Sequence, residues 1–438
     1  MRDSFYSLAD QLVAQCAGAE VLLLNFAAER SDFVRFNNSL LRQAGNVLQQ
    51  YLDLELIDCD KHVSETISLS GDGQENLRKA SASLDGLRAR LPQVPADPYL
   101  LYAQEVRSSE KTGACKLPPV KDAVGAILTA GAGKDLVGIH AQGESGGGFA
   151  NSFGQRNWFA THSFHFEWCL YAQGDKAVKS AYAGFEWSGA ELAAKMATAA
   201  GQLGALGRPA KTVPPGEYRL YLAPAAFAEF TDMLGWGGYG LKSHRTKTTC
   251  LLKMLEEGAA FSPLFSAKEN TVEGLSPNFT DAGYVKPDSV HLVTAGRFDT
   301  CLVSPRSARE YGAEVNSDGE SPSSLDIAAG DLPRDEVLQR LGEGVYCNQL
   351  WYLNWSDMPA CRITGMTRFA TFWVEGGEIV APLNVMRFDE TGYRALGSNL
   401  LALTREREFL PDSGTYDARS TDSARVPGAL IEGFRFTL

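Results

Sequence analysis

The histidines of this chain are few, and one short segment holds two of them beside a carboxylate. His162 and His165 lie in THSFHFE, and Glu167 follows two residues later. Two imidazoles and a carboxylate are a ligand set that catalytic zinc uses. An HxxH spacing brings both rings together in a helix, whereas in a strand His165 shares a face with Glu167 but not with His162. The aromatic segment WFATHSFHFEWCLY favours a strand. We therefore expect histidines on a solvated strand face and retain a metal site as the alternative.

Other catalytic patterns give no active site. The sequence contains no HExxH or HExxxH motif, and its eight cysteines are scattered without a CxxC pair. Such cysteines are typical of reduced, buried thiols. A Cys–His nucleophile pair stays open, because its two members meet only in the folded chain.

The most glycine-rich stretch, Gly143–Gly154, reads GESGGGFANSFG. It has neither the GK[ST] of a phosphate-binding loop nor a GxGxxG that leads from a strand into a helix. The segment after it is aromatic and strand-like. The sequence therefore predicts a flexible turn between two strands rather than a nucleotide site.

Composition describes an ordinary globular protein with an acidic balance. The chain has 438 residues, 44% of them hydrophobic, and 41 Lys and Arg against 53 Asp and Glu give a net charge of −12. An acidic chain without a basic stretch is a poor partner for nucleic acid. No window approaches 18 consecutive apolar residues, so we expect no membrane span. Polar residues interrupt the first 20 positions, which predicts no signal peptide and a cytoplasmic location.

The elements that must position these residues are helices and strands in alternating groups. Helical spacing or Ala-rich composition predicts helices at Ser4–Ala17, Gln74–Leu91, Pro119–Ala132 and Gly189–Leu206. Strands of an antiparallel meander are expected at Val21–Phe26, Phe33–Phe36 and Val47–Ile57, and a further strand at Asn157–Ala172. The proline-rich Gly207–Gly216 is the best candidate for a domain boundary.

The second half turns strongly to β structure. After a strand at Tyr218–Leu222, helices are predicted at Ala225–Leu234 and Thr246–Glu257. Strands follow at Val345–Trp355, Arg362–Val374 and Glu378–Phe388, with Gly376-Gly377 as a hairpin turn, and a last strand at Leu430–Leu438. The expected fold class is α+β in two domains, an N-terminal α+β domain over residues 1–207 and a mostly antiparallel β domain over residues 217–438.

Several motifs, in the same order, resemble the TldD/PmbA (TldD/TldE) family. Asn354–Phe388 resembles its C-terminal signature, including the Gly-hydroxyl-Arg element as Gly365, Thr367 and Arg368. The other matching segments are Glu29–Gly45, Asn151–Gly154, Asn278–Gly283 (NFTDAG, with Ala282 where an acidic residue is usual), Gly296–Ala308, Gly377–Ile379, Pro382 and Pro427-Gly428. The resemblance singles out Asn354, Gly365, Thr367 and Arg368 as motif or peptide-binding residues. Arg368 has a second interpretation, pairing with a carboxylate or covering apolar surface with its stem.

The resemblance implies a two-domain protein that dimerises around a cavity. In the family, the TldD-type subunit is a zinc-dependent peptidase that holds its metal with HExxxH and a C-terminal cysteine. The corresponding helix here reads AAFAEFTDMLGWGG, without histidine, and the last cysteine is Cys361. The chain therefore resembles the TldE (PmbA) type, with no cofactor of its own and zinc expected only in a TldD-like partner.

Three hypotheses follow for function. The first is a non-catalytic subunit of a peptidase complex that presents unfolded or modified peptides to a TldD-like partner. The second is a homodimer that binds peptides without cleaving them. The third is an autonomous metallopeptidase with non-standard ligands, for which His162, His165 and Glu167 are the only usable cluster.

Overall fold

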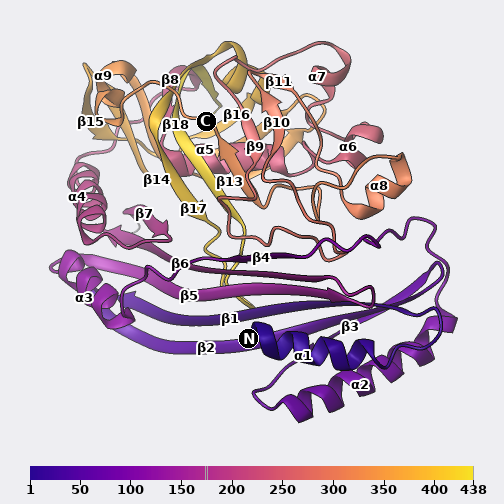
Figure 1. Ribbon diagram of the computed structural model, residues 1–438. Helices are drawn as coiled ribbons and strands as arrows, with labels where there is room; N and C mark the ends of the chain where they lie inside the picture. Colours follow the sequence, from indigo (N-terminus) through magenta and orange to yellow (C-terminus); the bar gives the residue numbers. More distant parts are fainter. Residues whose placement is uncertain (173, 175, 438) are drawn as a thin grey trace.

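Two mostly antiparallel β-sheets lie one above the other in the view of Figure 1 and form the framework of the protein. This computed structural model describes residues 1–172, 174 and 176–437. Within these residues the first sheet has seven strands and the second has eleven. Helices accompany both sheets, which confirms the α+β class with an N-terminal and a C-terminal domain.

The first sheet has the strand order β3-β2-β1-β5-β6-β4, with β7 paired to β6. Its strands are β1 (Val21–Asn37), β2 (Leu40–Asp58), β3 (Lys61–Ser68), β4 (Ser109–Thr112), β5 (Asp135–Asn151), β6 (Arg156–Tyr171) and β7 (Ala177–Gly184). The pieces expected between Val21 and Ile57 are thus two continuous strands. Asn38 and Ser39 join them in a two-residue turn, and both have the positive φ that such a turn requires.

Helices cover the lower face of this sheet in Figure 1. They are α1 (Arg2–Val13) and α2 (Gly73–Arg90), while α3 (Val120–Gly131) lies at the left end and α4 (Gly189–Leu206) rises toward the second sheet. Asp72 caps α2 by accepting hydrogen bonds from two backbone N–H groups of its first turn. Phe5 and Leu84 from the helices pack with Trp158 of β6 in one core. All four helices confirm the sequence predictions.

The predicted turn over Gly143–Gly154 is wrong for most of its length. Residues 143–151 belong to β5, and only residues 152–154 turn toward β6. A Cβ on Gly148 would lie 2.7 Å from the ring of Phe5, and one on Gly143 would lie 2.1 Å from the carbonyl oxygen of Arg30. These glycines therefore permit close approach inside a sheet, which overrides their poor strand propensity.

The second sheet has the order β11-β10-β9-β12-β18-β16-β14-β13-β8, with β15 on β14 and β17 on β18. Its strands are β8 (Gly216–Leu222), β9 (Ala267–Glu269), β10 (Val290–Thr294), β11 (Arg297–Phe298), β12 (Ser324–Ile327), β13 (Gly344–Asp357), β14 (Arg362–Glu375), β15 (Glu378–Pro382), β16 (Arg387–Thr391), β17 (Leu400–Pro411) and β18 (Ser423–Phe436). The Gly376-Gly377 hairpin is confirmed, since Glu375 pairs with Glu378. The predicted last strand is confirmed as part of β18, and Leu438 lies outside the described residues.

Short helices flank the second sheet. They are α5 (Pro224–Gly235), α6 (Leu241–Arg245), α7 (Leu252–Glu256), α8 (Pro305–Tyr311) and α9 (Val337–Leu341). The prediction of one helix over Thr246–Glu257 is wrong, because the chain breaks between α6 and α7. Lys247 has φ +60°, and the hydroxyl of Thr249 accepts from the Leu251 backbone and donates to the Gly238 carbonyl. Threonine side chains compete with helical hydrogen bonds in this way.

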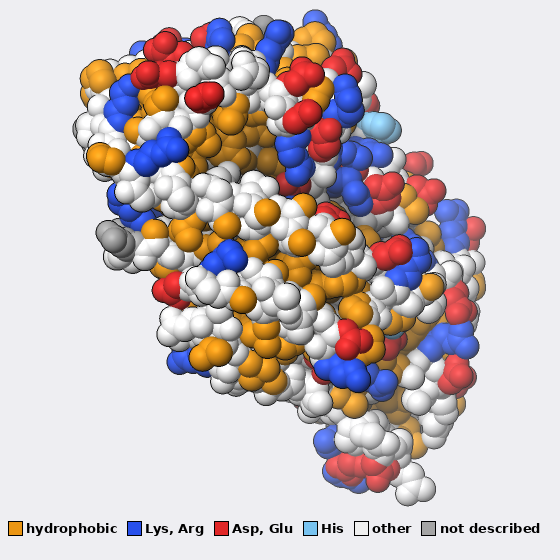
Figure 2. Space-filling model, turned by 90° about the vertical axis from the view of Figure 1, so that its left-hand side faces the viewer, with side chains coloured by type: hydrophobic (Ala, Val, Ile, Leu, Met, Phe, Trp, Pro, Cys, Tyr) orange, Lys and Arg blue, Asp and Glu red, His pale blue; other side chains and the backbone are white. Residues whose placement is uncertain are grey.

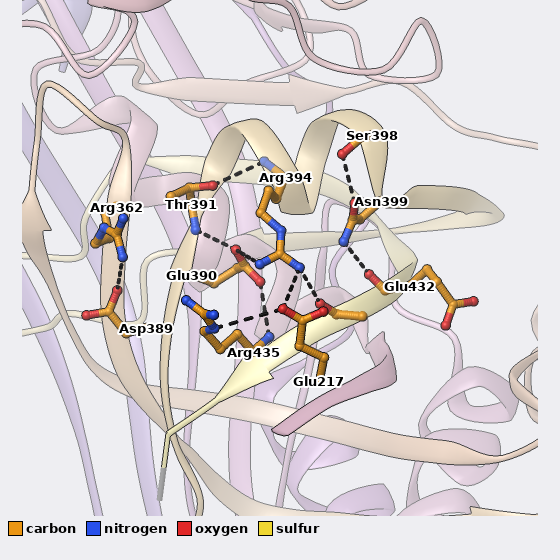
Figure 3. Close-up of polar contacts among 11 residues, drawn as sticks. Glu217, Arg362, Asp389, Glu390, Thr391, Arg394, Ser398, Asn399, Glu432 and Arg435 are labelled. Carbon is orange, nitrogen blue, oxygen red and sulfur yellow. Dashed lines mark hydrogen bonds and ion pairs between the residues drawn. The ribbon is translucent and has the colours of Figure 1, made fainter. Parts of the chain in front are cut away.

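An ion-pair network connects β18 with β8 and β16 in the second sheet (Figure 3). The Arg394 guanidinium lies 3.1 Å from Glu217 and 3.8 Å from Glu390, and it donates to the Gly433 carbonyl at 3.0 Å. Arg435 lies 3.9 Å from Glu217. Burial raises the pKa of Glu390. Each of these charged side chains is paired with another member of the network, so their role is to hold the strands together.

The molecular surface carries charges of both signs. On the face drawn in Figure 2, Lys and Arg side chains are interspersed with Asp and Glu, and hydrophobic side chains lie between them. Within the part of the chain that the structure describes, no helix is both long enough and apolar enough to cross a membrane.

Candidate functional site

A cavity of about 340 Å³ lies between the first sheet and two segments from the second half of the chain, residues 277–281 and 418–421. The second of these segments belongs to the connection between β17 and β18, which extends down to the first sheet in Figure 1. Gln49 of β2 donates a hydrogen bond to the Asp417 carbonyl in that connection, at 2.8 Å. The volume is within the range of small-molecule and peptide side-chain sites, which prefer domain interfaces.

Small residues on inner strands make the floor of this cavity hollow. Ala27 of β1 is exposed although the second half of the chain lies above it, and Ser145 and Gly147 of β5 lie beside it. A Cβ on Gly147 would lie 3.2 Å from the Pro277 ring. The glycine-rich segment thus shapes a site that the sequence did not reveal, and the only signal was small residues at every second position, 143, 145 and 147.

Two carboxylates, Asp53 and Asp281, line one part of the cavity. Asp53 of β2 accepts a hydrogen bond from the Thr66 hydroxyl at 3.1 Å. The protein around Asp281, with the carboxylate of Asp318 nearby, raises the pKa of Asp281 to about 7. Among residues 1–172, 174 and 176–437, no Lys or Arg lies within ion-pair distance of Asp53 or Asp281.

Glu29 and Arg419 form a buried polar pair at another part of the lining. Glu29 is 4% exposed, and its Oε2 accepts from Gln49 at 2.9 Å and from the Arg419 backbone N–H at 3.2 Å. Among the residues that the structure describes, its Oε1 has no hydrogen-bond partner. The Arg419 guanidinium donates to the backbone oxygen and hydroxyl of Ser163 at 3.1 and 2.6 Å. Burial lowers the pKa of Arg419 to about 10, so it is charged at neutral pH.

The predicted histidine cluster is not brought together. His165 and Glu167 share the face of β6 that points to the second sheet, whereas His162 lies on the other side with Nδ1 3.2 Å from the Gly113 carbonyl. His165 is 5% exposed, so the expected solvated face is wrong for it. Burial lowers the pKa of His165 to about 3, which keeps the ring neutral. Glu167 instead pairs with Lys179 at 2.9 Å. The aromatic strand is covered by the second half of the chain, which sequence periodicity could not show.

One Cys–His pair does form in space. Cys301 Sγ lies 3.4 Å from His244 Nδ1, and His244 Nε2 lies 2.6 Å from the Gly238 carbonyl. The carbonyl makes Nε2 the protonated nitrogen and leaves Nδ1 as an acceptor. Burial raises the pKa of Cys301 to about 11, however, and so opposes the thiolate that nucleophilic catalysis needs.

The motif residues of β13 and β14 lie away from the cavity. A Cβ on Gly365 would lie 2.7 Å from the Phe388 ring, so glycine is required for packing there. The buried Thr367 hydroxyl accepts from the Met386 backbone at 3.1 Å. The Arg368 guanidinium stacks on the exposed Trp351 at 4.8 Å. Asn354 is also exposed, and its side chain accepts from its own neighbour in sequence.

Helix α5 packs against β13 and β18 and carries two acidic side chains. Glu229 accepts a hydrogen bond from the Leu350 backbone at 2.6 Å, and burial raises its pKa to about 7. Burial also raises the pKa of Asp232.

Residues 215–438 match the family description "PmbA/TldA metallopeptidase C-terminal domain". The chain belongs to the PmbA/TldD family. The whole fold is similar to a Thermotoga maritima protein described as a modulator of a DNA gyrase, with a TM-score of 0.75 and 14% identity over 100% of both chains. TldE from Thermococcus kodakarensis gives the same TM-score and identity over 100% of this chain and 99% of its own. A Bacteroides thetaiotaomicron protein described as a modulator of DNA gyrase has a TM-score of 0.71 and 16% identity, over 99% of this chain and 98% of its own. No curated protein sequence matches this chain.

For a PmbA/TldD chain, the ligand set of α5 decides whether zinc fits. The helix offers Glu229 and Asp232 and no histidine, and Glu229 is already held by the backbone of β13. Within the described residues, no three His, Cys, Asp or Glu side chains are grouped so that they could hold a metal. A catalytic zinc with three protein ligands therefore does not fit the residues present.

Proposed function

We propose that this PmbA/TldD-family chain is the metal-free, TldE-like subunit of a zinc-dependent peptidase that acts on unfolded or modified peptides. The observation that carries the proposal is α5, where a buried Glu229 bonded to the Leu350 backbone occupies the helix that holds histidine ligands in the family's peptidases. The similarity of the whole fold to TldE supports the same assignment. The zinc and the chemistry then belong to a TldD-like partner.

The role of this subunit is to bind the peptide beside the partner's site. Residues 51–58 of β2 pair with β3, and Leu69 continues this pairing to the Gln50 carbonyl, but residues 40–49 have no described strand on the outer edge of β2. A free strand edge pairs with an extended peptide or with another subunit through backbone hydrogen bonds, whatever the side chains. Such pairing suits a complex that accepts many sequences.

The test combines metal content with partner capture. The chain, purified without tag or chelator, is measured by elemental analysis together with the mass of its oligomer. We expect less than about 0.1 zinc per chain, because a catalytic site needs a full ion. A pull-down from the native host should then recover a chain with HExxxH, and the pair should cleave an unfolded peptide that neither chain cleaves alone.

Two results would overturn this assignment. Near one metal per isolated chain would restore the autonomous metallopeptidase, and His162→Ala and His165→Ala would locate the ion. A metal-free homodimer that captures no second chain would favour the peptide-binding homodimer.

A further inference from the structure

We propose that the cavity between the first sheet and the segments 277–281 and 418–421 binds a cationic group on an apolar stem, either an Arg or Lys side chain or the terminal ammonium of a peptide. The inference deepens the proposed function by naming the class of peptide. It rests on that function only for the statement that the ligand is a peptide.

The walls suit an apolar stem. Ala27 and Gly147 form the floor, and Phe159 and Phe279 close the sides. Asn25 of β1 donates a hydrogen bond to the Asp281 carbonyl at 2.9 Å, which fixes the loop that carries Asp281 to the sheet. The hollow is therefore built by contacts between the sheet and the loop, and its volume admits one long side chain with its backbone.

The charge of the lining is negative and incompletely paired. Asp53 and Asp281 have no Lys or Arg within ion-pair distance in the described chain. Lys286 is the cation whose field reaches Asp281, and the carboxylates of Asp318, Asp53 and Glu55 oppose its effect. A guanidinium or ammonium would supply the missing charge and donate to both carboxylates.

Glu29 independently points to a ligand. It is 4% exposed, it lines the cavity, and its Oε1 is buried with no hydrogen-bond partner in the described part of the chain. A buried carboxylate oxygen without a donor costs free energy. Arg419 cannot supply that donor in its present position, since its guanidinium is directed to Ser163. A donor brought by the ligand would satisfy Oε1.

The experiment measures binding of three short peptides to the purified full chain by isothermal titration calorimetry at pH 8. The probes are N-acetylated Ala-Arg-Ala amide, the same peptide with neutral citrulline for Arg, and Ala-Ala-Ala amide with a free amino terminus. We expect the Arg peptide to bind at least about tenfold more tightly than the citrulline peptide, because a charge-assisted pair is lost. Preference for the third peptide over the acetylated citrulline peptide would identify a terminal ammonium as the ligand.

Variants connect the preference to the cavity. Asp53→Asn with Asp281→Asn should remove the preference for the cationic peptide, and Ala27→Leu should weaken all binding by filling the floor. Asp335→Asn, an exposed carboxylate on the 3₁₀ turn at 334–336, is the matched control and should bind as the parent does. Thermal unfolding of each variant establishes that it folds.

Equal affinity for the charged and neutral peptides would overturn the proposal. So would a preference that persists in the folded Asp53→Asn/Asp281→Asn chain. These outcomes differ from those that test the subunit hypothesis. A chain that captures a TldD-like partner but binds charged and neutral peptides equally would refute only the proposed cation site.

Discussion

Arg419→Met tests whether one buried side chain holds the β17–β18 connection on the first sheet. Arg419 is 8% exposed, and its guanidinium donates to the backbone oxygen and hydroxyl of Ser163. Longer contacts of 3.4 Å reach the Ser31 hydroxyl and the Gly143 carbonyl. Methionine preserves the apolar stem while it removes the charge and the donors.

The expected loss is large because the site is buried. A hydrogen bond to a charged group contributes about 1.5–3 kcal/mol, and the Arg419 guanidinium donates two short ones to Ser163. Glu29 is bonded to Arg419 only through the backbone N–H, which methionine keeps, but its charge stabilises the guanidinium electrostatically. We expect Arg419→Met to lower the free energy of unfolding by about 3–5 kcal/mol.

Urea unfolding followed by tryptophan fluorescence measures this loss, and limited proteolysis tests release of residues 411–423. Arg405→Met is the matched control, because Arg405 is exposed and its guanidinium makes only a long hydrogen bond of 3.4 Å, to the Asp331 carbonyl, within the described residues. It should stay within about 0.5 kcal/mol of the parent. In a double-mutant cycle, Glu29→Gln should reduce the cost of Arg419→Met by about 0.5–3 kcal/mol. A loss below about 1 kcal/mol, or strict additivity with Glu29→Gln, would refute the reasoning.

The remaining predictions concern titration and packing. Burial raises the pKa of Glu229 from 4.5 to about 7, so ionisation is disfavoured in the folded state and stability falls as pH rises through this interval. Glu229→Gln should therefore be about 3 kcal/mol more stable than the parent at pH 8 and match it near pH 4. Burial lowers the pKa of His165 from 6.5 to about 3, so protonation of the unfolded chain costs stability as pH falls below 6.5. His165→Leu should lower that slope by about 1.4 kcal/mol per pH unit. Gly148→Ala should cost about 1–3 kcal/mol by overpacking against Phe5, whereas Gly125→Ala, in open space on α3, should gain up to about 1 kcal/mol.

Urea titrations across pH 4–8 and thermal melts measure these effects. A constant difference between Glu229→Gln and the parent over that range would contradict the burial of an ionised Glu229. An unchanged acid slope in His165→Leu would show that another group takes up the proton. Equal stabilities of the two glycine variants would contradict the packing argument.

Helices and strands were predictable from the sequence where one face is buried and the other is exposed, because the apolar residues then recur with the period of the element. The helix at Gly189–Leu206 matches its prediction, and the Gly376-Gly377 turn pairs the strands as expected. Failures occurred where tertiary contacts decide the backbone. Gly143–Gly154 was predicted as a turn because glycine disfavours strands, yet the contacts of Phe5 and Arg30 require glycine within β5.

The candidate site was largely hidden from sequence. Glu167 and His165 were placed correctly on one strand face, because alternation along a strand is a local rule. The cavity residues Asp53, Asp281 and Arg419 are separated by more than a hundred positions each, and no motif links them. Gly365 of the family motif lets the Phe388 ring pack closely against β14. A sequence motif is the same whether its glycine serves packing or ligand contact, so this role became visible only in the structure.

The cavity exists only while the two halves of the chain are docked. Its acidic groups come from distant segments, Glu29 and Asp53 from the first sheet and Asp281 from a loop of the second half. A ligand that bridges Asp53 and Asp281 must therefore also stabilise the docked form by mass action. Without a ligand, Glu29 Oε1 destabilises the docked form, because it is buried with no hydrogen-bond donor among the described residues. Ligand binding and the docking of the two halves are therefore coupled, because the cavity is formed by both halves.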